Sequence, residues 1–244
     1  MRYVIVGASS GVGRALAASF AAAGHDLIVV SSDARDIAAT ATDLSIRHGR
    51  QVSPVSADIT NLDQYLTRLE RAIADTDGVD GLFLPVGAVL EHDNGELDPA
   101  AAEWTMRANF TAVAATVTTM LPYFLARGCG TIAGFGSVAA TRGRGSNIIY
   151  AASKRALESF FESLRHRCVG TGVVVQFYVL GYLDTALSYG RRTPLRPGAP
   201  EALSMLVLRK LGSDVGVVYY PGVWRWVTVI LRLLPWPIFK RLSF

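Results

Sequence analysis

Three residues suited to proton transfer stand close together in the sequence. Ser137 precedes Tyr150 by thirteen residues, and Lys154 follows Tyr150 by four. Residues four apart share one face of a helix, so the Lys154 ammonium would lie near the Tyr150 phenol. A neighbouring cation favours the phenolate and lowers the phenol's ordinary pKa of about 10. The spacing predicts a tyrosine that exchanges a proton at neutral pH, beside a serine hydroxyl that hydrogen-bonds an oxygen as charge builds on it.

A glycine-rich segment near the start supplies a second chemical feature. Gly7, Gly11 and Gly13 follow the apolar run Arg2–Val6 and open a helical pattern. Glycine allows a positive φ in a tight turn, and without a Cβ a pyrophosphate can approach the N–H groups at the helix N-terminus. The context predicts a dinucleotide cradle, and a tight turn without a ligand is the alternative.

Short apolar runs alternate with helical patterns along the chain, as is typical of parallel βαβ units. Strands are predicted at Arg2–Val6, Asp26–Ser31, Gln51–Ser56, Val79–Leu84, Thr131–Phe135, Val173–Leu180 and Val217–Tyr220. Helices are predicted at Val12–Ala23, Asp33–His48, Asn61–Asp75, Ala100–Arg127 and Ile148–Val169. The 244 residues, half of them hydrophobic, suffice for one large core. We predict an α/β fold with a three-layer, doubly wound, Rossmann-like parallel sheet in a single domain.

The predicted domain covers residues 1–221, and residues 222–244 form a separate amphipathic, basic tail. Within the domain, residues 182–200 combine glycines, prolines and arginines after the sixth strand. Open α/β sheets bind ligands at the carboxyl edge that such a segment crosses. We therefore predict that 182–200 is a mobile substrate loop.

The glycine turn and the Tyr-xxx-Lys pair together resemble the short-chain dehydrogenase/reductase family, over roughly Arg2 to Thr185. Val6 stands where the family usually has threonine. Leu84-Pro85-Val86-Gly87 replaces the family's Asn-Asn-Ala-Gly and keeps only Gly87. The resemblance implies hydride transfer between a nicotinamide cofactor and a carbonyl or carbinol carbon, with Tyr150 donating or accepting the proton.

The resemblance also implies roles for individual residues. Asn109, in Met106-Arg-Ala-Asn-Phe, matches an asparagine that orients a proton-relaying water, and Lys154 also holds the nicotinamide ribose. The implied catalytic set is Asn109, Ser137, Tyr150 and Lys154. The implied cofactor contacts are Gly7, Ser9, Ser10, Gly11, Val12 and Gly13 in the turn, Ser31 and Ser32 at the ribose, Asp58 and Ile59 at the adenine, Gly87, and Leu183 and Thr185 at the carboxamide. No metal site is predicted.

The end of the second predicted strand bears on the choice between NAD(H) and NADP(H). An acid there grips a ribose 2′-hydroxyl, and an arginine receives a 2′-phosphate. Ser32 stands where phosphate-preferring relatives often carry arginine, and Asp33 would repel a phosphate that Arg35 could reach. NADH is favoured over NADPH on this basis. The structural alternative is that Ser31, Ser32 and Asp33 cap the following helix.

The two cysteines indicate a cellular setting. Cys129 and Cys168 lie far apart, and the apolar start is too short for a secretory segment. We therefore expect free thiols and a cytoplasmic location.

The tail 222–244 carries three of the four tryptophans together with arginines and lysines. Its apolar stretch Trp224–Leu234 is too short to span a bilayer, but it suits a helix lying at headgroup level on the inner face of the membrane. A helix docked on the protein or in a dimer interface is the alternative. In layout the tail resembles the decaprenylphosphoryl ketoribose reductase branch of the family, which implies a lipid-linked ketosugar whose phosphate would meet Arg191, Arg192 and Arg196.

Other functions fit less of the sequence. A non-catalytic nucleotide sensor or scaffold would explain the lost asparagines at Leu84 and Pro85, but not the retained Tyr150 and Lys154. Nucleic acid is not an expected partner, because the basic residues cluster with tryptophans and no recognised binding motif accompanies them. The expected partner is a small or lipid-linked carbonyl compound. The resemblance also implies a homo-oligomer formed through two long helices.

Overall fold

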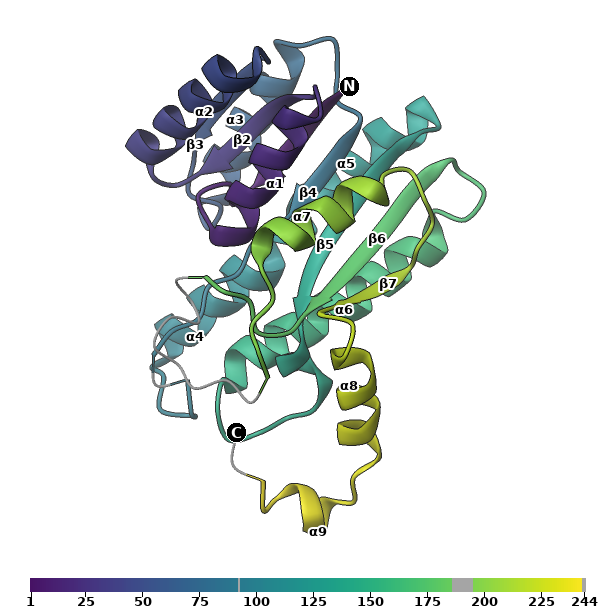
Figure 1. Ribbon diagram of the computed structural model, residues 1–244. Coiled ribbons are helices and arrows are strands. Elements are labelled where there is room, and N and C mark those ends of the chain that lie inside the picture. Colours follow the sequence, from purple (N-terminus) through teal and green to yellow (C-terminus); the bar gives the residue numbers. More distant parts are fainter. Residues whose placement is uncertain (92, 186–194, 243–244) are drawn as a thin grey trace.

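The computed structural model describes residues 1–91, 93–185 and 195–242 and is built on one seven-stranded sheet (Figure 1). The strands are β1 (Arg2–Val6), β2 (Asp26–Ser31), β3 (Val52–Ser56), β4 (Gly81–Leu84), β5 (Gly130–Ser137), β6 (Val173–Leu180) and β7 (Val217–Tyr220). Their order is β3-β2-β1-β4-β5-β6-β7, and every neighbouring pair is parallel. The predicted doubly wound parallel sheet in a single domain is confirmed.

Helices cover both faces of this sheet and complete the three layers (Figure 1). One layer holds α1 (Gly11–Ala22), α2 (Ala34–His48) and α7 (Pro200–Arg209), and the other holds α3 (Leu62–Ala74), α5 (Ala112–Arg127) and α6 (Ile148–Arg167). Alternation along β1 sends Val4 and Val6 to one hydrophobic core, and Tyr3 and Ile5 to the other. Buried strands therefore read as continuous apolar runs.

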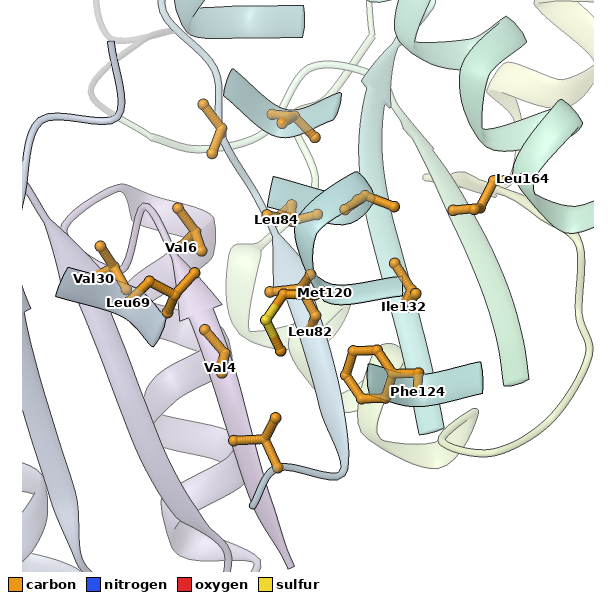
Figure 2. Close-up of a cluster of buried hydrophobic side chains, with 14 of the residues drawn as sticks. Val4, Val6, Val30, Leu69, Leu82, Leu84, Met120, Phe124, Ile132 and Leu164 are labelled. Atoms are coloured by element: carbon orange, nitrogen blue, oxygen red, sulfur yellow. The ribbon is translucent and has the colours of Figure 1, made fainter. Parts of the chain in front are cut away.

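The core beneath α3 and α5 is the one drawn in Figure 2. Leu69 from α3 lies near Val4 and Val30, while Met120 and Phe124 from α5 lie over Leu82 and Ile132 (Figure 2). Because all neighbouring strands are parallel, their carboxyl ends lie along one edge of the sheet. That edge is at the bottom of the sheet in Figure 1.

The predicted helix Ala100–Arg127 is wrong in one respect. The structure divides it into α4 (Pro99–Met106), a π-helical turn η1 (Arg107–Thr111) and α5. A single wide turn barely disturbs the apolar periodicity, so the sequence pattern looks continuous. Such turns are frequent at functional sites, and this one carries Asn109.

Some elements are absent from the sequence prediction. They are α7, the 3₁₀ turn η2 (Val138–Thr141) directly after β5, and the short α9 (Trp236–Phe239). The predicted tail helix is confirmed as α8 (Trp224–Leu233), which lies with α9 beyond the carboxyl edge of the sheet (Figure 1). Among the described residues, none of the helices has the length and apolarity to cross a bilayer. Cys129 is exposed, Cys168 is buried, and both are free thiols as expected.

Candidate active site

A cavity of about 370 Å³ lies at the carboxyl edge, where the segments after β1, β4, β5 and β6 meet. It is lined by ten of the predicted site residues: Ser9, Ser10, Gly11, Val12, Gly87, Ser137, Tyr150, Lys154, Leu183 and Thr185. These come from segments up to 176 positions apart in the chain. The fold thus brings the glycine turn and the Tyr-xxx-Lys pair to one hollow, where open α/β sheets bind ligands.

The glycine turn between β1 and α1 has the backbone shape of an anion cradle. Gly7 has a φ of +89°, and its N–H and that of Ala8 both donate to the Val30 carbonyl, at 2.9 and 3.0 Å. The Ser10 hydroxyl accepts from the Gly13 N–H at 3.0 Å and caps α1. A Cβ on Gly13 would overlap the Gly7 carbonyl oxygen. The turn therefore needs glycine at these positions and directs the N-terminus of α1 into the cavity.

Gly11 brings this turn against the segment after β6. A Cβ on Gly11 would lie 2.7 Å from the Thr185 side-chain methyl group, so the turn and Thr185 meet closely. Leu183 is buried and pairs with Gly198 in a short parallel bridge. The two residues predicted to meet the carboxamide therefore face the same cavity as the turn, and their cofactor role stays a prediction.

Lys154 is buried in the wall of the cavity, with 2% of its surface exposed. Its Nζ donates to the carbonyl oxygens of Val86 at 2.6 Å and Phe135 at 3.0 Å, which ties the ends of β4 and β5 together. Burial lowers the pKa of this ammonium group to about 7. Lys154 can therefore both hold and release a proton near neutral pH.

Tyr150 lies one helical turn before Lys154 in α6, with the Lys154 Nζ 5.9 Å from the centre of its ring. Burial raises the pKa of this phenol above its ordinary value, while hydrogen bonding with Ser137 and the charge of Arg144 act in the opposite direction. The predicted acidification by Lys154 is therefore wrong for the chain in this state. Desolvation disfavours the phenolate more than the neighbouring groups favour it.

Ser137 is the last residue of β5 and the N-cap of η2. Its hydroxyl accepts from the Ala139 N–H at 3.1 Å, which holds the oxygen in the cavity lining, within hydrogen-bonding reach of Tyr150. The predicted strand stopped at Phe135. The structure extends β5 by two residues, and both pair with β6. The extension places Ser137 at the edge of the sheet.

The helix that carries Tyr150 is capped by a residue that the sequence analysis missed. Asp93 is buried, and its two carboxylate oxygens accept from the N–H groups of Ile149 at 2.9 Å and Tyr150 at 2.8 Å. Its carbonyl accepts from Ile148. Asn147, the residue before the helix, has a positive φ and makes no side-chain cap. The carboxylate of Asp93, 57 positions before Tyr150, thus takes the place of a local N-cap. Its negative charge also interacts favourably with the dipole at the N-terminus of the helix.

Asn109 is fully buried in η1, and its amide is fully engaged with backbone groups. Its Oδ1 accepts from the Ala88 N–H at 2.8 Å, and its Nδ2 donates to the carbonyls of Ala88 and Thr105 at 2.7 and 3.0 Å. The side chain therefore fixes the segment after β4 that contains Gly87. Its predicted role in orienting a water stays a prediction.

The segment Leu84–Val86 shows how the missing asparagines are replaced. Leu84 is buried in the core, and the carbonyl of Val86 receives the Lys154 ammonium. A Cβ on Gly7 would lie 3.4 Å from the Pro85 carbonyl, so this segment packs against the glycine turn. Backbone contacts serve here where the family has polar side chains.

The predicted adenine and ribose contacts lie beyond the cavity lining, at the carboxyl ends of β2 and β3 and in the residues that follow. Ser31 donates to the Ser9 hydroxyl at 2.7 Å and so supports the turn, while Ser32 is exposed. Asp33 caps α2 by accepting from the N–H groups of two following residues, as the structural alternative held. Asp58 accepts from the backbone and hydroxyl of Thr60. Their contact with a cofactor, like that of the partly buried Ile59, stays a prediction.

The predicted mobile loop 182–200 is described only at its two ends. Asp184 N–H donates to the Gly198 carbonyl and Gly198 N–H donates to the Tyr182 carbonyl, both at 2.9 Å. These bonds hold both ends against each other. The predicted mobility concerns residues 186–194, including Arg191 and Arg192, which lie outside the described residues.

Comparisons with known proteins match most of the chain. A family model described as "short chain dehydrogenase" covers residues 2–195. An uncharacterized oxidoreductase of Myxococcus xanthus is 29% identical over 97% of this chain and 93% of the relative. The 1-deoxy-11-beta-hydroxypentalenate dehydrogenase of Streptomyces exfoliatus is 31% identical over 86% of this chain and 79% of the relative.

A solved structure agrees with the fold. A short-chain dehydrogenase from Sphingobium yanoikuyae in complex with NADPH superposes with a TM-score of 0.83 at 24% identity, covering 94% of this chain and 91% of that one. This match supports the architecture. The family model supports the resemblance drawn from the glycine turn, Tyr150 and Lys154.

Proposed function

Because the chain belongs to the short-chain dehydrogenase/reductase family, we propose that it reduces a ketone to an alcohol with a nicotinamide cofactor. One observation carries the proposal: Ser137, Tyr150 and Lys154 line the same cavity as the glycine turn. The turn fits a dinucleotide, since the space that a Cβ on Gly13 would need is taken up by the backbone and α1 presents its N-terminus. When bound, the cofactor supplies the hydride for the carbonyl carbon.

The side chains of the cavity handle the proton. The Ser137 hydroxyl hydrogen-bonds the carbonyl oxygen of the substrate as negative charge develops there. The raised pKa keeps Tyr150 protonated, so its hydroxyl donates the proton that turns this oxygen into an alcohol. Lys154, whose pKa is about 7, is the nearby group that can return a proton to Tyr150 from solvent. In this protonation state Tyr150 is ready to donate the proton that reduction requires.

The preferred cofactor in this proposal is NADH rather than NADPH. Asp33 follows β2, and its carboxylate would repel a 2′-phosphate. The nearby Arg14 is held by Asp36, with both carboxylate oxygens at 2.7 Å. Fluorescence titration with both cofactors tests the preference, and Asp33→Arg should shift it toward NADPH. Equal affinities in the unaltered chain would contradict it.

Contact with a membrane surface is a separate part of the proposal. Trp226, Ile230 and Leu233 on α8 and Trp236 on α9 are exposed, and Arg225 and Lys240 lie beside them. Large apolar and basic side chains together suit an anionic headgroup layer. Such a location, on the inner face of the membrane, would suit a lipid-linked ketosugar as substrate. A homo-oligomer, tested by analytical ultracentrifugation, stays a prediction from the family.

Stopped-flow oxidation of bound NADH by a panel of ketones tests the main proposal. The unaltered chain should oxidise NADH with at least one ketone, and Tyr150→Phe should bind NADH normally but turn over about a thousandfold more slowly. Turnover within a few fold of the unaltered chain would remove Tyr150 from the mechanism. A chain that binds NADH but oxidises it with none of the ketones would instead support the sensor or scaffold.

A further inference from the structure

A second cavity adjoins the active site and is assigned no role by the reaction. Its volume is about 300 Å³, and it lies between η2 and the C-terminal helices. We propose that this cavity binds the apolar chain of the substrate, so that the enzyme acts on ketones carrying a linear or branched hydrocarbon tail. The inference rests on the proposed reductase function and names the substrate class of the same site.

The walls of the second cavity are mostly hydrocarbon. Trp224, Val227 and Leu231 from α8 form one side, and Phe239 from α9 and Leu195 contribute to the lining. These three residues of α8 are spaced three and four positions apart, so they lie on one face of the helix. This apolar face lines the cavity opposite η2. A hydrocarbon chain in contact with this stripe would be removed from water, which favours binding.

Besides the Tyr182 phenol and the Trp224 indole, the lining has three polar residues, which are Thr141, Arg142 and Arg144. The Arg142 guanidinium donates to the carbonyls of Leu231, at 3.0 Å, and Leu234, and it lies 4.0 Å from the centre of the Phe239 ring. Its charge is therefore directed at the C-terminal end of α8, which leaves its aliphatic stem for the cavity. Arg142 thus fastens α8 and α9 over the cavity instead of offering a site for a polar ligand.

The second cavity is continuous in its lining with the first. Val138, Ala139, Arg144 and Tyr182 border both. Tyr182 packs edge-on against Trp224 with ring centres 5.6 Å apart, and the charge of Arg144 acts on Tyr150. A ketone at Tyr150 would therefore extend its substituent past η2 toward α8. The polar carbonyl group would lie in the first cavity, beside Ser137 and Tyr150, and the apolar tail in the second, against α8.

Trp224 fixes the position of α8, which forms one wall of the second cavity. Trp224 is buried, and a Cβ on Gly181 would overlap its indole ring. The absence of a side chain at Gly181 thus lets α8 pack against the end of β6. Arg232 adds a contact of 3.1 Å with Glu158 on α6. The helix that closes the second cavity is consequently held on the domain from two sides.

A series of methyl ketones from 2-butanone to 2-decanone tests the inference. With saturating NADH, kcat/KM should rise about fourfold for each methylene that enters the cavity. The rise should lie mainly in KM, because the tail contributes uniform binding. Values of kcat/KM that stay level along the series would overturn the inference and leave the reductase function standing.

Two variants fill the cavity, and one control leaves it open. Leu231→Trp and Val227→Phe should raise the KM for 2-decanone at least tenfold and leave that for 2-butanone within twofold. Ile230→Trp places a similar bulk on the exposed side of α8 and should behave like the unaltered chain. Val227→Phe keeps the test decisive if Leu231→Trp fails to fold, which NADH binding by each variant reveals.

Calorimetric binding of 2-decanone separates the inference from the proposed function. If the unaltered chain reduces no ketone but binds 2-decanone, and Leu231→Trp weakens this binding at least tenfold while Ile230→Trp does not, the cavity is an apolar-chain site and only the reaction is wrong. Lack of 2-decanone binding, or equal binding by all variants, would overturn the inference whether or not 2-butanone is reduced.

Discussion

The carboxyl edge of the sheet and the C-terminal helices solve opposite packing problems. At the edge, Asp93, Asn109 and Lys154 are buried polar side chains, and each is matched to backbone groups from distant segments. In α8 and α9, large apolar side chains such as Trp226 and Leu233 face outward, at 68% and 77% exposure. The inner side of α8 packs on the domain while the outer side has no described partner.

This difference predicts how the two regions respond to change. A buried polar group left without its partner is costly, so substitutions at the edge should affect both geometry and stability. Exposed apolar side chains contribute little to folding, so substitutions on the outer side of α8 should leave both almost unchanged. The contrast indicates that the carboxyl edge holds its side chains in a fixed geometry, whereas the exposed side of α8 and α9 is suited to contact with an apolar surface.

Lys154→Met should have the largest effect and tests whether a buried polar group at the edge serves function more than stability. Turnover should fall at least a hundredfold, because the proton reservoir beside Tyr150 and the tie between Val86 and Phe135 are lost. Stability at neutral pH should not fall in proportion, since a desolvated ammonium is removed. Steady-state kinetics and urea unfolding measure the two effects.

The pH dependence of stability sharpens the same test. The folded pKa of Lys154 is about 7 and the unfolded value is 10.5, so between these values the unfolded state binds more protons. The contribution of Lys154 to the free energy of unfolding therefore rises with pH, by about 2 kcal/mol from pH 7 to 9. Urea unfolding should show this rise in the unaltered chain relative to Lys154→Met. Parallel pH profiles for the two proteins would contradict the buried ammonium.

Asp93→Ala should have the next largest effect, because it removes the remote cap of the helix that carries Tyr150. We expect a loss of about 2 kcal/mol in unfolding free energy and about tenfold in kcat, with KM little changed. Asp93→Asn keeps one acceptor oxygen and should recover part of kcat. Asp98→Ala removes the side-chain cap of α4 and is the matched control, with some loss of stability and unchanged kcat. Equal kcat in the two alanine variants would show that Asp93 has no positioning role.

Arg142→Met tests the boundary between the two regions. The change keeps an apolar stem but removes the donors to the Leu231 and Leu234 carbonyls. We expect a loss of about 1 kcal/mol in unfolding free energy and a several-fold higher KM for 2-decanone, since α8 is then less firmly held. Arg155→Met, whose exposed side chain pairs with Glu158 on the same helix, should change neither value. A similar response in both variants would argue against the fastening of α8.

The sequence predicted the features that depend on local patterns. The glycine turn, the alternation of strands and helices, and the spacing of Tyr150 and Lys154 are all visible in short stretches of the sequence. The π-helical turn at Asn109 was missed because one extra residue in a helix leaves the apolar periodicity intact.

Features that depend on distant contacts could not be predicted in this way. Asp93 caps a helix that starts 55 residues later, and no local motif marks it. The pKa of Tyr150 was predicted in the wrong direction, because spacing reports the nearby ammonium but not the desolvation of the phenol. The one-sided packing of α8 likewise required the position of η2, since the sequence shows an amphipathic helix without showing which face is covered.

The smallest effect on folding should come from substitutions on the outer side of α8. They test directly whether this side, unlike the carboxyl edge, serves contact with a partner and not folding. Replacing Trp226, Ile230 and Leu233 together by serine should change the unfolding free energy by less than about 1 kcal/mol and leave turnover of 2-butanone unchanged, because these side chains are exposed. Flotation with vesicles containing anionic lipid should fall clearly, since the apolar anchors are gone. Serine at the exposed Ile46 of α2 is the control for a lost surface hydrophobe. If the triple variant floats like the unaltered chain, α8 does not contact membranes, and its exposed face must be explained by another partner.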